Sequence, residues 1–207
     1  MIAAFAYLTA VPSARSTDLP APVPVAIPAM PVGLPASTPG PGDQFEARFG
    51  TFDHGVGSVE RNTVDINSSI VTPRLNVGAP GYWAYFLPRF QLGGAVNLAG
   101  RTSFGYADIA LTLPIIPHWL FFEPFIGGAI HDGSLHGTPT LSALGCPALF
   151  HAGASFGVPI TEHWSVLGTF EHLSNGKGIF GVDCGTNQGG GYNQGLNNYG
   201  VSVGYAF

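Results

Sequence analysis

From Asp43 to its last residue, the chain alternates between apolar residues and polar or small residues along eight separate segments. Successive side chains of a β-strand point to opposite faces of the sheet, so this period of two predicts strands with one apolar face each. The pattern therefore predicts an all-β protein. The eight predicted strands span residues 45–50, 64–70, 89–98, 108–113, 120–131, 150–156, 164–172 and 199–207.

The charge content restricts which all-β fold these strands build. Only 9% of the residues are charged and 45% are hydrophobic, whereas an ordinary soluble domain carries about 25% charged residues. The sequence contains no uninterrupted apolar run of about 18 residues, the length that indicates a transmembrane helix. Eight is the smallest even strand number of the apolar-surfaced barrels of outer membranes. We therefore predict an eight-stranded antiparallel transmembrane β-barrel in the bacterial outer membrane.

The charges and the connections between strands agree with this prediction. Connections 113–118 and 159–163 are short, whereas 131–146 and 175–196 are long and glycine-rich, as in outer-membrane barrels. The alternative is a soluble lipocalin-like barrel with its apolar face inward, which the low charge content disfavours because charged residues cover soluble surfaces. Most charges in the segments fall on the polar face, where they would pair inside a narrow barrel: Glu46, Arg48, Asp65, Arg89, Asp108, Glu123 and Glu171.

The first residues are predicted to lie outside the barrel. Residues 1–14 resemble the apolar part of a secretory signal peptide, although they lack a positively charged start. Residues 15–42 are dense in proline and show no strand or helix period, which predicts an extended linker. The barrel domain is expected to span residues 43–207. The net charge of -5 argues against nucleic acid as a partner.

The two cysteines are both expected at the end of the barrel that carries the long loops. A disulfide between Cys146 and Cys184 would suit an oxidising compartment, and two unpaired thiols are the alternative. Two cysteines and scattered histidines have no metal-ligand spacing, so no metal site is predicted. The scattered histidines are expected to be polar groups of the rim or the lumen: His54, His118, His131, His136, His151 and His163.

Polar residues on an otherwise apolar face mark a candidate catalytic site. His172 and Ser174 are two apart on a predicted strand, so they share the lipid-facing side of Trp164 and Phe170. A histidine beside a serine is the minimum for an activated nucleophile. Asn197 opens the neighbouring strand on the same face, where its amide oxygen could accept Nδ1–H of His172. The alternative is that these three residues merely contact lipid headgroups.

The segments 170–175, 193–197 and 200–207 together resemble the C-terminus of the lipid A deacylase (PagL) family. The last of them is an alternating strand that ends on an aromatic residue, a type enriched at membrane–water interfaces. The resemblance implies an eight-stranded outer-membrane barrel that removes the ester-linked acyl chain at the 3 position of lipid A. It implies lipid A or lipopolysaccharide as the partner, and no cofactor.

The resemblance also implies roles for individual residues. His172 would be the general base and Ser174 the nucleophile, while Asn193 and the neighbourhood of Asn175 would help to form the oxyanion hole. The acidic third member of the family falls on Asn197, which can orient an imidazole but adds no negative charge.

An insertion of residues 176–191 also lengthens the spacing between the histidine and this third member. Asp183 in that insertion could supply a carboxylate, but a long loop seldom holds catalytic geometry. The alternative hypothesis is a catalytically silent structural or adhesive barrel. A passive pore is disfavoured because side chains fill the lumen of eight strands. Formation of a homodimer is left open.

Overall fold

The alternating segments form strands in the structure, a computed structural model that describes residues 42–75, 81–176 and 194–207. These residues contain nine strands and one short 3-10 helix. In chain order the elements are β1 (Glu46–His54), β2 (Thr63–Val71), η1 (Gly81–Phe86), β3 (Arg89–Asn97), β4 (Phe104–Ala110), β5 (Leu113–Ile116), β6 (Leu120–His131), β7 (Ala148–Pro159), β8 (Trp164–Ser174) and β9 (Leu196–Ala206).

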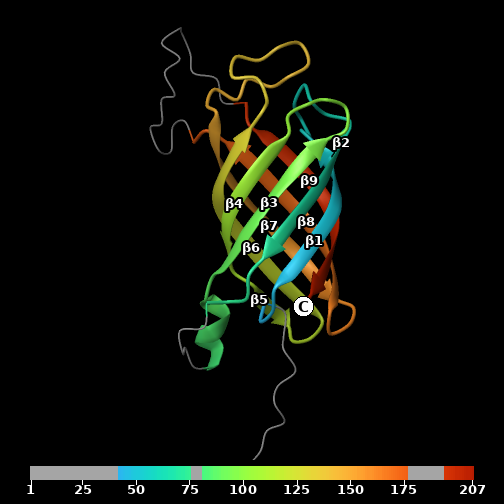
Figure 1. Cartoon of the computed structure of the whole chain (residues 1–207), viewed down its shortest axis with the longest axis vertical. Helices are drawn as coiled ribbons and strands as arrows, with labels where there is room; N and C mark the ends of the chain where they lie inside the picture. Colours follow the sequence, from blue (N-terminus) through green and yellow to red (C-terminus); the bar gives the residue numbers. More distant parts are fainter. Residues whose placement is uncertain (1–41, 76–80, 177–193) are drawn as a thin grey trace, which may run out of the picture. The chain divides into compact units, whose positions relative to one another are not determined.

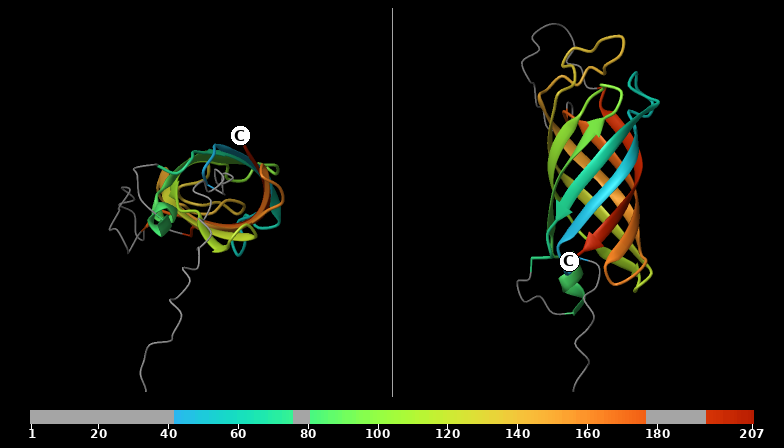
Figure 2. Two further views of the ribbon diagram at one scale, coloured as in Figure 1. Left: turned by 90° about the horizontal axis from the view of Figure 1, so that it is seen from below. Right: turned by 45° about the vertical axis from the view of Figure 1, so that its right-hand side comes forward.

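Eight of these strands close into an antiparallel barrel. The hydrogen-bonded order is β4-β3-β2-β1-β9-β8-β7-β6, and pairing of β4 with β6 closes the ring. β5 hydrogen-bonds to β6 and extends a hairpin at one end. Figure 1 shows the tilted wall of strands, and the axial view in Figure 2 shows the closed ring. The prediction of an eight-stranded antiparallel barrel is confirmed.

The region around β4 and β5 differs from the sequence prediction. The strand predicted over 108–113 begins earlier and ends earlier, because Phe104 and Tyr106 are buried inside the barrel and give no polar signal on the inward face. The connection 113–118, predicted as a simple short turn, contains β5. A left-handed residue, His118 at φ 65°, and a hydrogen bond from Trp119 N to the Ile116 carbonyl make the tight turn that follows it.

The connection between β2 and β3 is not a simple turn. It contains η1, whose side chains Tyr82, Trp83 and Phe86 are strongly exposed. Aromatic side chains of this kind suit the interface between a membrane and water. No helix within residues 42–75, 81–176 and 194–207 is long and apolar enough to cross a membrane.

The outer wall of the barrel is apolar and the inner wall is polar, as the alternation predicted. Large apolar side chains such as Phe49, Leu92, Ile126 and Val201 are more than half exposed on the outward face. The charged positions predicted to face inward are all buried: Glu46, Arg48, Asp65, Arg89, Asp108, Glu123 and Glu171. In water this arrangement would expose a large apolar surface, which favours a lipid environment.

Ion pairs fill one half of the lumen. Arg48 donates to Glu123 at 2.6 Å and to Glu46 at 2.9 Å, and Arg89 donates to both carboxylates at 3.2 Å. Thr112 adds a hydrogen bond to Glu123 at 2.6 Å. Buried charges need partners of this kind, because an unpaired charge would cost several kcal/mol, about 3 to 5 by the effect of removing one partner. These pairs occupy the space that a passive pore would need.

Aromatic rings also line the lumen, where they pack over glycines on adjacent strands. Phe121 lies directly across from Gly157, and a Cβ on that glycine would come within 2.0 Å of the ring. Phe52 has the same relation to Gly200. The absence of a side chain at these glycines is what lets the rings lie flat on the inner wall.

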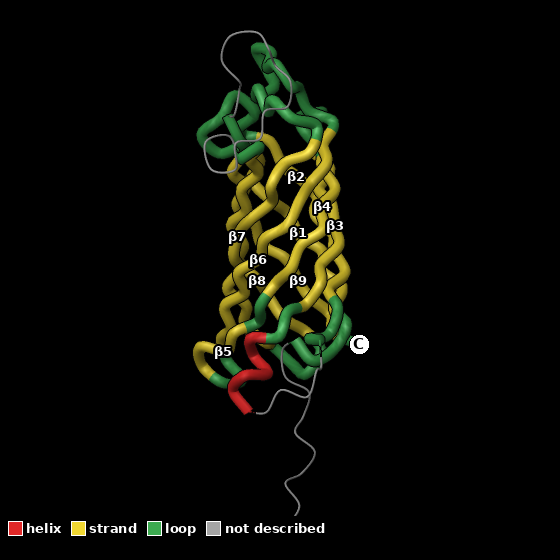
Figure 3. The backbone as a smooth tube through the Cα atoms, turned by 90° about the vertical axis from the view of Figure 1, so that its left-hand side faces the viewer, coloured by secondary structure: helices red, strands yellow, loops and turns green. Residues whose placement is uncertain are grey.

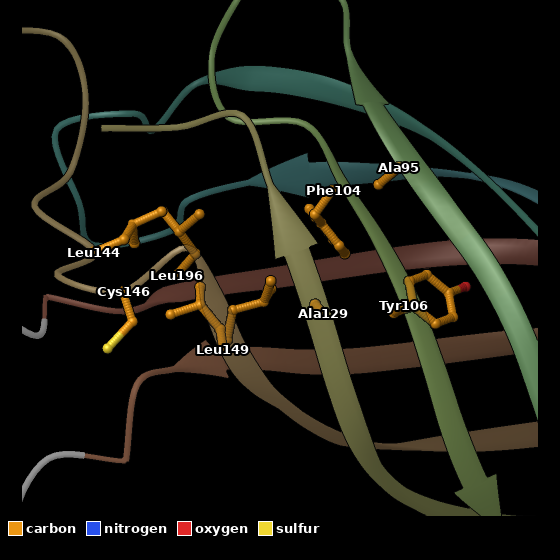
Figure 4. Packing of buried hydrophobic residues seen from close by; sticks show 9 residues of the cluster. Ala95, Phe104, Tyr106, Ala129, Leu144, Cys146, Leu149 and Leu196 are labelled. Atoms are coloured by element: carbon orange, nitrogen blue, oxygen red, sulfur yellow. The ribbon is translucent and has the colours of Figure 1, made fainter. Parts of the chain in front are cut away.

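The loops gather at one end of the barrel, called the loop end here, which comprises residues 55–62, 98–103 and 132–147 together with the end of β8 and the start of β9. Figure 3 shows these loops at the top and η1 at the bottom. Leu144 folds into the barrel mouth and packs in a buried cluster with Leu149 and Leu196 (Figure 4). Cys146 belongs to this cluster and is 2% exposed. The cluster fixes the loop 132–147 against the strands that carry the candidate site.

Candidate active site

The candidate site lies where β8 ends and β9 begins, on the outward face at the loop end. His172 and Asn197 are direct partners in the register of these two strands. Their side chains meet in a hydrogen bond of 2.7 Å between Nδ1 of His172 and Oδ1 of Asn197. Both side chains are half-buried. The sequence prediction that Asn197 lies beside His172 on the adjacent strand agrees with this geometry.

This hydrogen bond fixes which nitrogen of His172 carries the proton. An amide oxygen only accepts, so Nδ1 donates its hydrogen to Asn197. Nε2 is then the basic nitrogen of the neutral imidazole, and it has no hydrogen-bond partner within the described residues. The geometry therefore presents a base at the outer surface of the barrel.

Gly195 keeps the space beside this base open. It adopts a left-handed conformation with φ 61°, and a Cβ there would come within 2.8 Å of the Leu173 carbonyl and 3.0 Å of His172 Cε1. Any larger residue would be strained by its backbone and would press on the imidazole. The sequence motif included Gly195 but did not predict that it leaves space beside His172, because crowding against a neighbouring strand has no signal in the sequence.

Ser174 lies two residues beyond His172 and is the last residue of β8. It shares the outward face with His172, so their α-carbons are about 6.6 Å apart along the strand. Its Oγ accepts a hydrogen bond from the backbone N–H of Gly176 at 3.2 Å, and the residue is half-buried. The predicted histidine and serine are therefore placed on one face at the end of one strand.

Of the two residues expected near an oxyanion hole, Asn175 lies within the described residues and Asn193 does not. Asn175 points inward and is 4% exposed, and its amide donates to the Leu144 carbonyl at 3.0 Å. Its side chain thus ties the end of β8 to the loop 132–147. Asn193 lies outside the described residues, and so does Asp183. Their roles stay predictions.

Other predictions also fall outside the described residues. Cys184 is among them, so its disulfide with Cys146 stays a prediction. Residues 1–14 and 15–41 are likewise not described, and the signal peptide and the linker stay predictions too. Within the described residues, no group of three or more histidines, cysteines or acids forms a metal site.

Behind the outward pair lies a buried polar chain on the inward face of the same strands. Asn198 donates to Glu171 at 3.0 Å and accepts from the Gly55 N–H at 2.8 Å. The Glu171 carboxylate lies 3.4 Å from Nε2 of His151, whose Nδ1 lies 2.9 Å from Asp108. Glu171 directly precedes His172 and Asn198 directly follows Asn197. These buried hydrogen bonds therefore hold the backbone that carries His172 and Asn197.

A second buried carboxylate, Glu60, connects the loops around the site. Its oxygens accept hydrogen bonds from Thr102 N at 2.8 Å, from Ser142 N at 2.7 Å and from His54 Nε2 at 3.1 Å. Burial alone would raise the pKa of the Glu60 carboxyl, but the hydrogen bonds from His54, Thr102 and Ser142 lower it to about 2. Sequence analysis missed Glu60, because it lies in a loop where no period marks it.

The loop segment that Glu60 holds is in turn bonded to the start of β9. Ala143, next to Ser142, exchanges two hydrogen bonds with Gln194: its N–H donates to the Gln194 side chain at 2.7 Å, and its carbonyl accepts from the Gln194 N–H at 3.1 Å. Val56 N donates to the Asn197 carbonyl at 2.7 Å. Both sides of the candidate site are therefore fixed by neighbouring loops.

Together, the closed barrel, its apolar outer wall and its charged lumen define an eight-stranded β-barrel of the bacterial outer membrane. The sequence of residues 74–206 matches the family described as lipid A 3-O-deacylase (PagL). The chain belongs to this family, whose members are outer-membrane proteins of Gram-negative bacteria.

Comparison with the solved structure of an outer-membrane enzyme supports the fold. The barrel is similar to the crystal structure of the outer membrane enzyme PagL, with 12% sequence identity and a TM-score of 0.52 over 78% of this chain and 99% of that one. It is also similar to the N-terminal β-barrel domain of Pseudomonas aeruginosa OprF, at 11% identity and a TM-score of 0.46 over 80% of this chain and 98% of that one. No curated protein sequence matches the chain.

Proposed function

We propose that this chain is a lipid A 3-O-deacylase in which Ser174 is the nucleophile, His172 the general base and Asn197 the residue that orients His172. The observation that carries the proposal is the 2.7 Å hydrogen bond between His172 Nδ1 and Asn197 Oδ1. It leaves Nε2 as the base on the strand that also carries Ser174. Membership of the family supports lipid A as the substrate.

The first half of the reaction forms an acyl-enzyme. Nε2 of His172 takes the proton of the Ser174 hydroxyl while Oγ attacks the carbonyl carbon of the ester. The tetrahedral intermediate then collapses, the bond to the sugar oxygen breaks, and His172 returns the proton to the departing 3-hydroxyl of the glucosamine. Donors that hold the developing oxyanion would each contribute about 3 kcal/mol, and Asn193 is our candidate for one of them.

The second half releases the fatty acid. A water molecule loses its proton to Nε2 of His172 and attacks the acyl carbonyl carbon. Collapse of the second tetrahedral intermediate breaks the bond to Ser174 Oγ, which regains its proton from His172. Every proton moves between Ser174, His172, the sugar and water, so the scheme requires no cofactor.

An asparagine in place of an acid is compatible with this scheme. In serine proteases, replacing the orienting aspartate by asparagine lowers turnover by about 10⁴-fold because the imidazole takes the wrong tautomer. In this site Oδ1 of Asn197 accepts the Nδ1 hydrogen, so the catalytic tautomer is kept. What Asn197 does not supply is negative charge to stabilise the imidazolium that forms during each step.

The position of the site suits a substrate that stays in the membrane. Below the His172–Asn197 pair the outward face continues with Phe170, Tyr199 and Val201, which are 37%, 51% and 57% exposed. Acyl chains would lie along this apolar wall while the ester reaches the rim. The substrate would therefore approach from the side, within the outer leaflet.

The test is mass spectrometry of lipid A from cells that express the chain, beside cells that express the Ser174→Ala variant. Loss of one hydroxyacyl chain only when Ser174 is present supports the proposal. Unchanged lipid A in both, with the barrel folded in the outer membrane, contradicts it and favours the catalytically silent barrel. Folding is checked by the heat-dependent gel mobility of the two proteins.

A further inference from the structure

A cavity of about 590 Å³ opens at the loop end directly beside the candidate site. Its wall includes Asn197 and Gly195 from the site and Gln194 just before them. The facing wall is the loop 55–62 between β1 and β2, with Ser58 and Arg61. Because Gly195 packs against the imidazole of His172, the cavity begins where the proposed chemistry takes place.

The cavity lies on the opposite side of the site from the apolar wall. Toward the middle of the barrel the outward face is built from Phe170, Tyr199 and Val201. Toward the loops the lining carries a guanidinium, a hydroxyl and two side-chain amides, together with the apolar Val56, Val59 and Pro139. A lipid whose ester reaches His172 must place its acyl chain on the apolar side and its polar headgroup on the other. The cavity is therefore where the headgroup would lie.

Arg61 gives this cavity a positive charge that nothing in the described part of the chain neutralises. Its side chain is exposed and forms no hydrogen bond or ion pair with the described residues. The neighbouring Glu60 does not compensate it, because that carboxylate is fully buried and turned toward His54, Thr102 and Ser142.

The other arginines show what an engaged guanidinium looks like in this barrel. Arg48 and Arg89 lie in the lumen with carboxylate partners, and Arg74 pairs with Asp43 at the far end. Arg101 lies at the loop end, as Arg61 does, but it donates to the Thr140 carbonyl at 2.9 Å. Arg61 differs from these four in facing a cavity with its guanidinium unpaired within the described residues.

We propose that this cavity receives the phosphorylated glucosamine headgroup of lipid A and that Arg61 pairs with one of its phosphates. The planar guanidinium binds phosphate oxygens through two parallel hydrogen bonds, a geometry that few other side chains offer. This proposal rests on the proposed function, since it takes lipid A as the substrate. It makes Arg61 a residue that selects the phosphorylated lipid and orients its sugar toward Ser174.

The experiment measures binding, so it needs no turnover. The Ser174→Ala barrel in a zwitterionic detergent is titrated calorimetrically with lipid A, with phosphatase-treated lipid A and with inorganic phosphate. Removal of the phosphates should weaken binding by about fivefold, the upper range for an exposed ion pair. Adding Arg61→Gln should abolish that difference, and Arg61→Lys should keep part of it. Arg101→Gln is the matched control and should leave it unchanged.

Two results would overturn the proposal. One is an Arg61→Gln variant that still distinguishes phosphorylated from dephosphorylated lipid A as well as its parent does. The other is inorganic phosphate that displaces lipid A at equal concentration, which would mean a site for the free anion and not for the lipid headgroup. Arg61 is exposed, so its substitutions do not threaten folding.

The outcome is separable from that of the proposed function. If phosphate-dependent binding needs Arg61 while lipid A stays intact in cells with Ser174, the headgroup site stands and deacylation fails. If lipid A loses its acyl chain but Arg61→Gln binds as its parent does, deacylation stands and the headgroup site fails.

Discussion

Three histidines on the strands of this barrel hydrogen-bond to other side chains, and the partners differ between the inside and the outside. In the lumen, His54 lies between Asp65 at 2.7 Å and Glu60 at 3.1 Å. His151 lies between Asp108 and Glu171 in the same way. On the outer wall, the ring of His172 has one hydrogen-bond partner among the described residues, the neutral amide of Asn197.

The difference separates a structural histidine from one that can do chemistry. Carboxylates only accept, so both ring nitrogens of His54 and of His151 act as donors and neither is available as a base. These imidazoles are fully buried and link acids on different strands and loops. His172 uses one nitrogen for its orientation and keeps the other for a proton. Of these three histidines, the one at the lipid surface is the one that keeps a ring nitrogen without a partner among the described residues.

The largest expected effect tests this contrast directly. His172→Gln should lower the rate of lipid A deacylation by about 10³-fold, because it removes the proposed general base while leaving a polar side chain of similar size. His151→Gln should instead lower the free energy of unfolding, because it removes the imidazole that lies between the buried carboxylates of Asp108 and Glu171. Turnover is measured by mass spectrometry of the product, and stability by the urea midpoint in detergent.

The distinction between a catalytic His172 and a structural His151 is contradicted if the two variants exchange their effects. An unstable His172→Gln barrel with normal turnover per folded molecule would make His172 structural. Loss of turnover in a stable His151→Gln barrel would place the chemistry in the lumen.

The second prediction concerns Glu60, one of the two acid partners of His54. The pKa of Glu60 is about 2 in the folded protein and about 4.3 in an unfolded chain, so its contribution to stability is complete above about pH 4.5 and lost as the pH falls toward 2. Glu60→Gln should therefore cost about 3 kcal/mol at neutral pH. The difference in urea midpoint between the two proteins should shrink between pH 4.5 and 2.

A difference that stays constant over that pH range would show that the charge of Glu60 does not stabilise the loop end. Glu162→Gln is a suitable control. This glutamate lies in the exposed turn between β7 and β8, at the other end of the barrel, and the substitution should change the midpoint little.

The wall of the barrel could be predicted from sequence because one rule, alternation, acts on every strand. It placed Arg48, Glu123 and Glu171 inside and Phe49 outside, as the structure has them. The rule failed where both faces are apolar. Phe104 and Tyr106 point inward, so β4 shows no alternation at its start and its bounds were wrong.

The site was predictable to the same extent. His172 and Asn197 follow from the face that alternation assigns and from the family motif, and their contact needs only a hairpin register. Glu60 and the space beside Gly195 do not follow, since they depend on three loops meeting and on one backbone angle. Contacts between distant loops leave no period in the sequence.

The smallest expected effect concerns Asn197, the neutral partner that distinguishes His172 from His54 and His151. Asn197→Ala removes one hydrogen bond and the control over the tautomer, and kcat should fall by about tenfold. Asn197→Asp keeps the acceptor for Nδ1–H. It also gives His172 a negatively charged partner, as His54 and His151 have in their neighbouring carboxylates. It should raise kcat above that of the parent, because a carboxylate stabilises the imidazolium that forms when Ser174 loses its proton. Initial rates on lipid A in detergent micelles measure both. If Asn197→Asp were slower than the parent while Asn197→Ala were unchanged, Asn197 would have no part in orienting the base, and the free Nε2 of His172 would need another explanation.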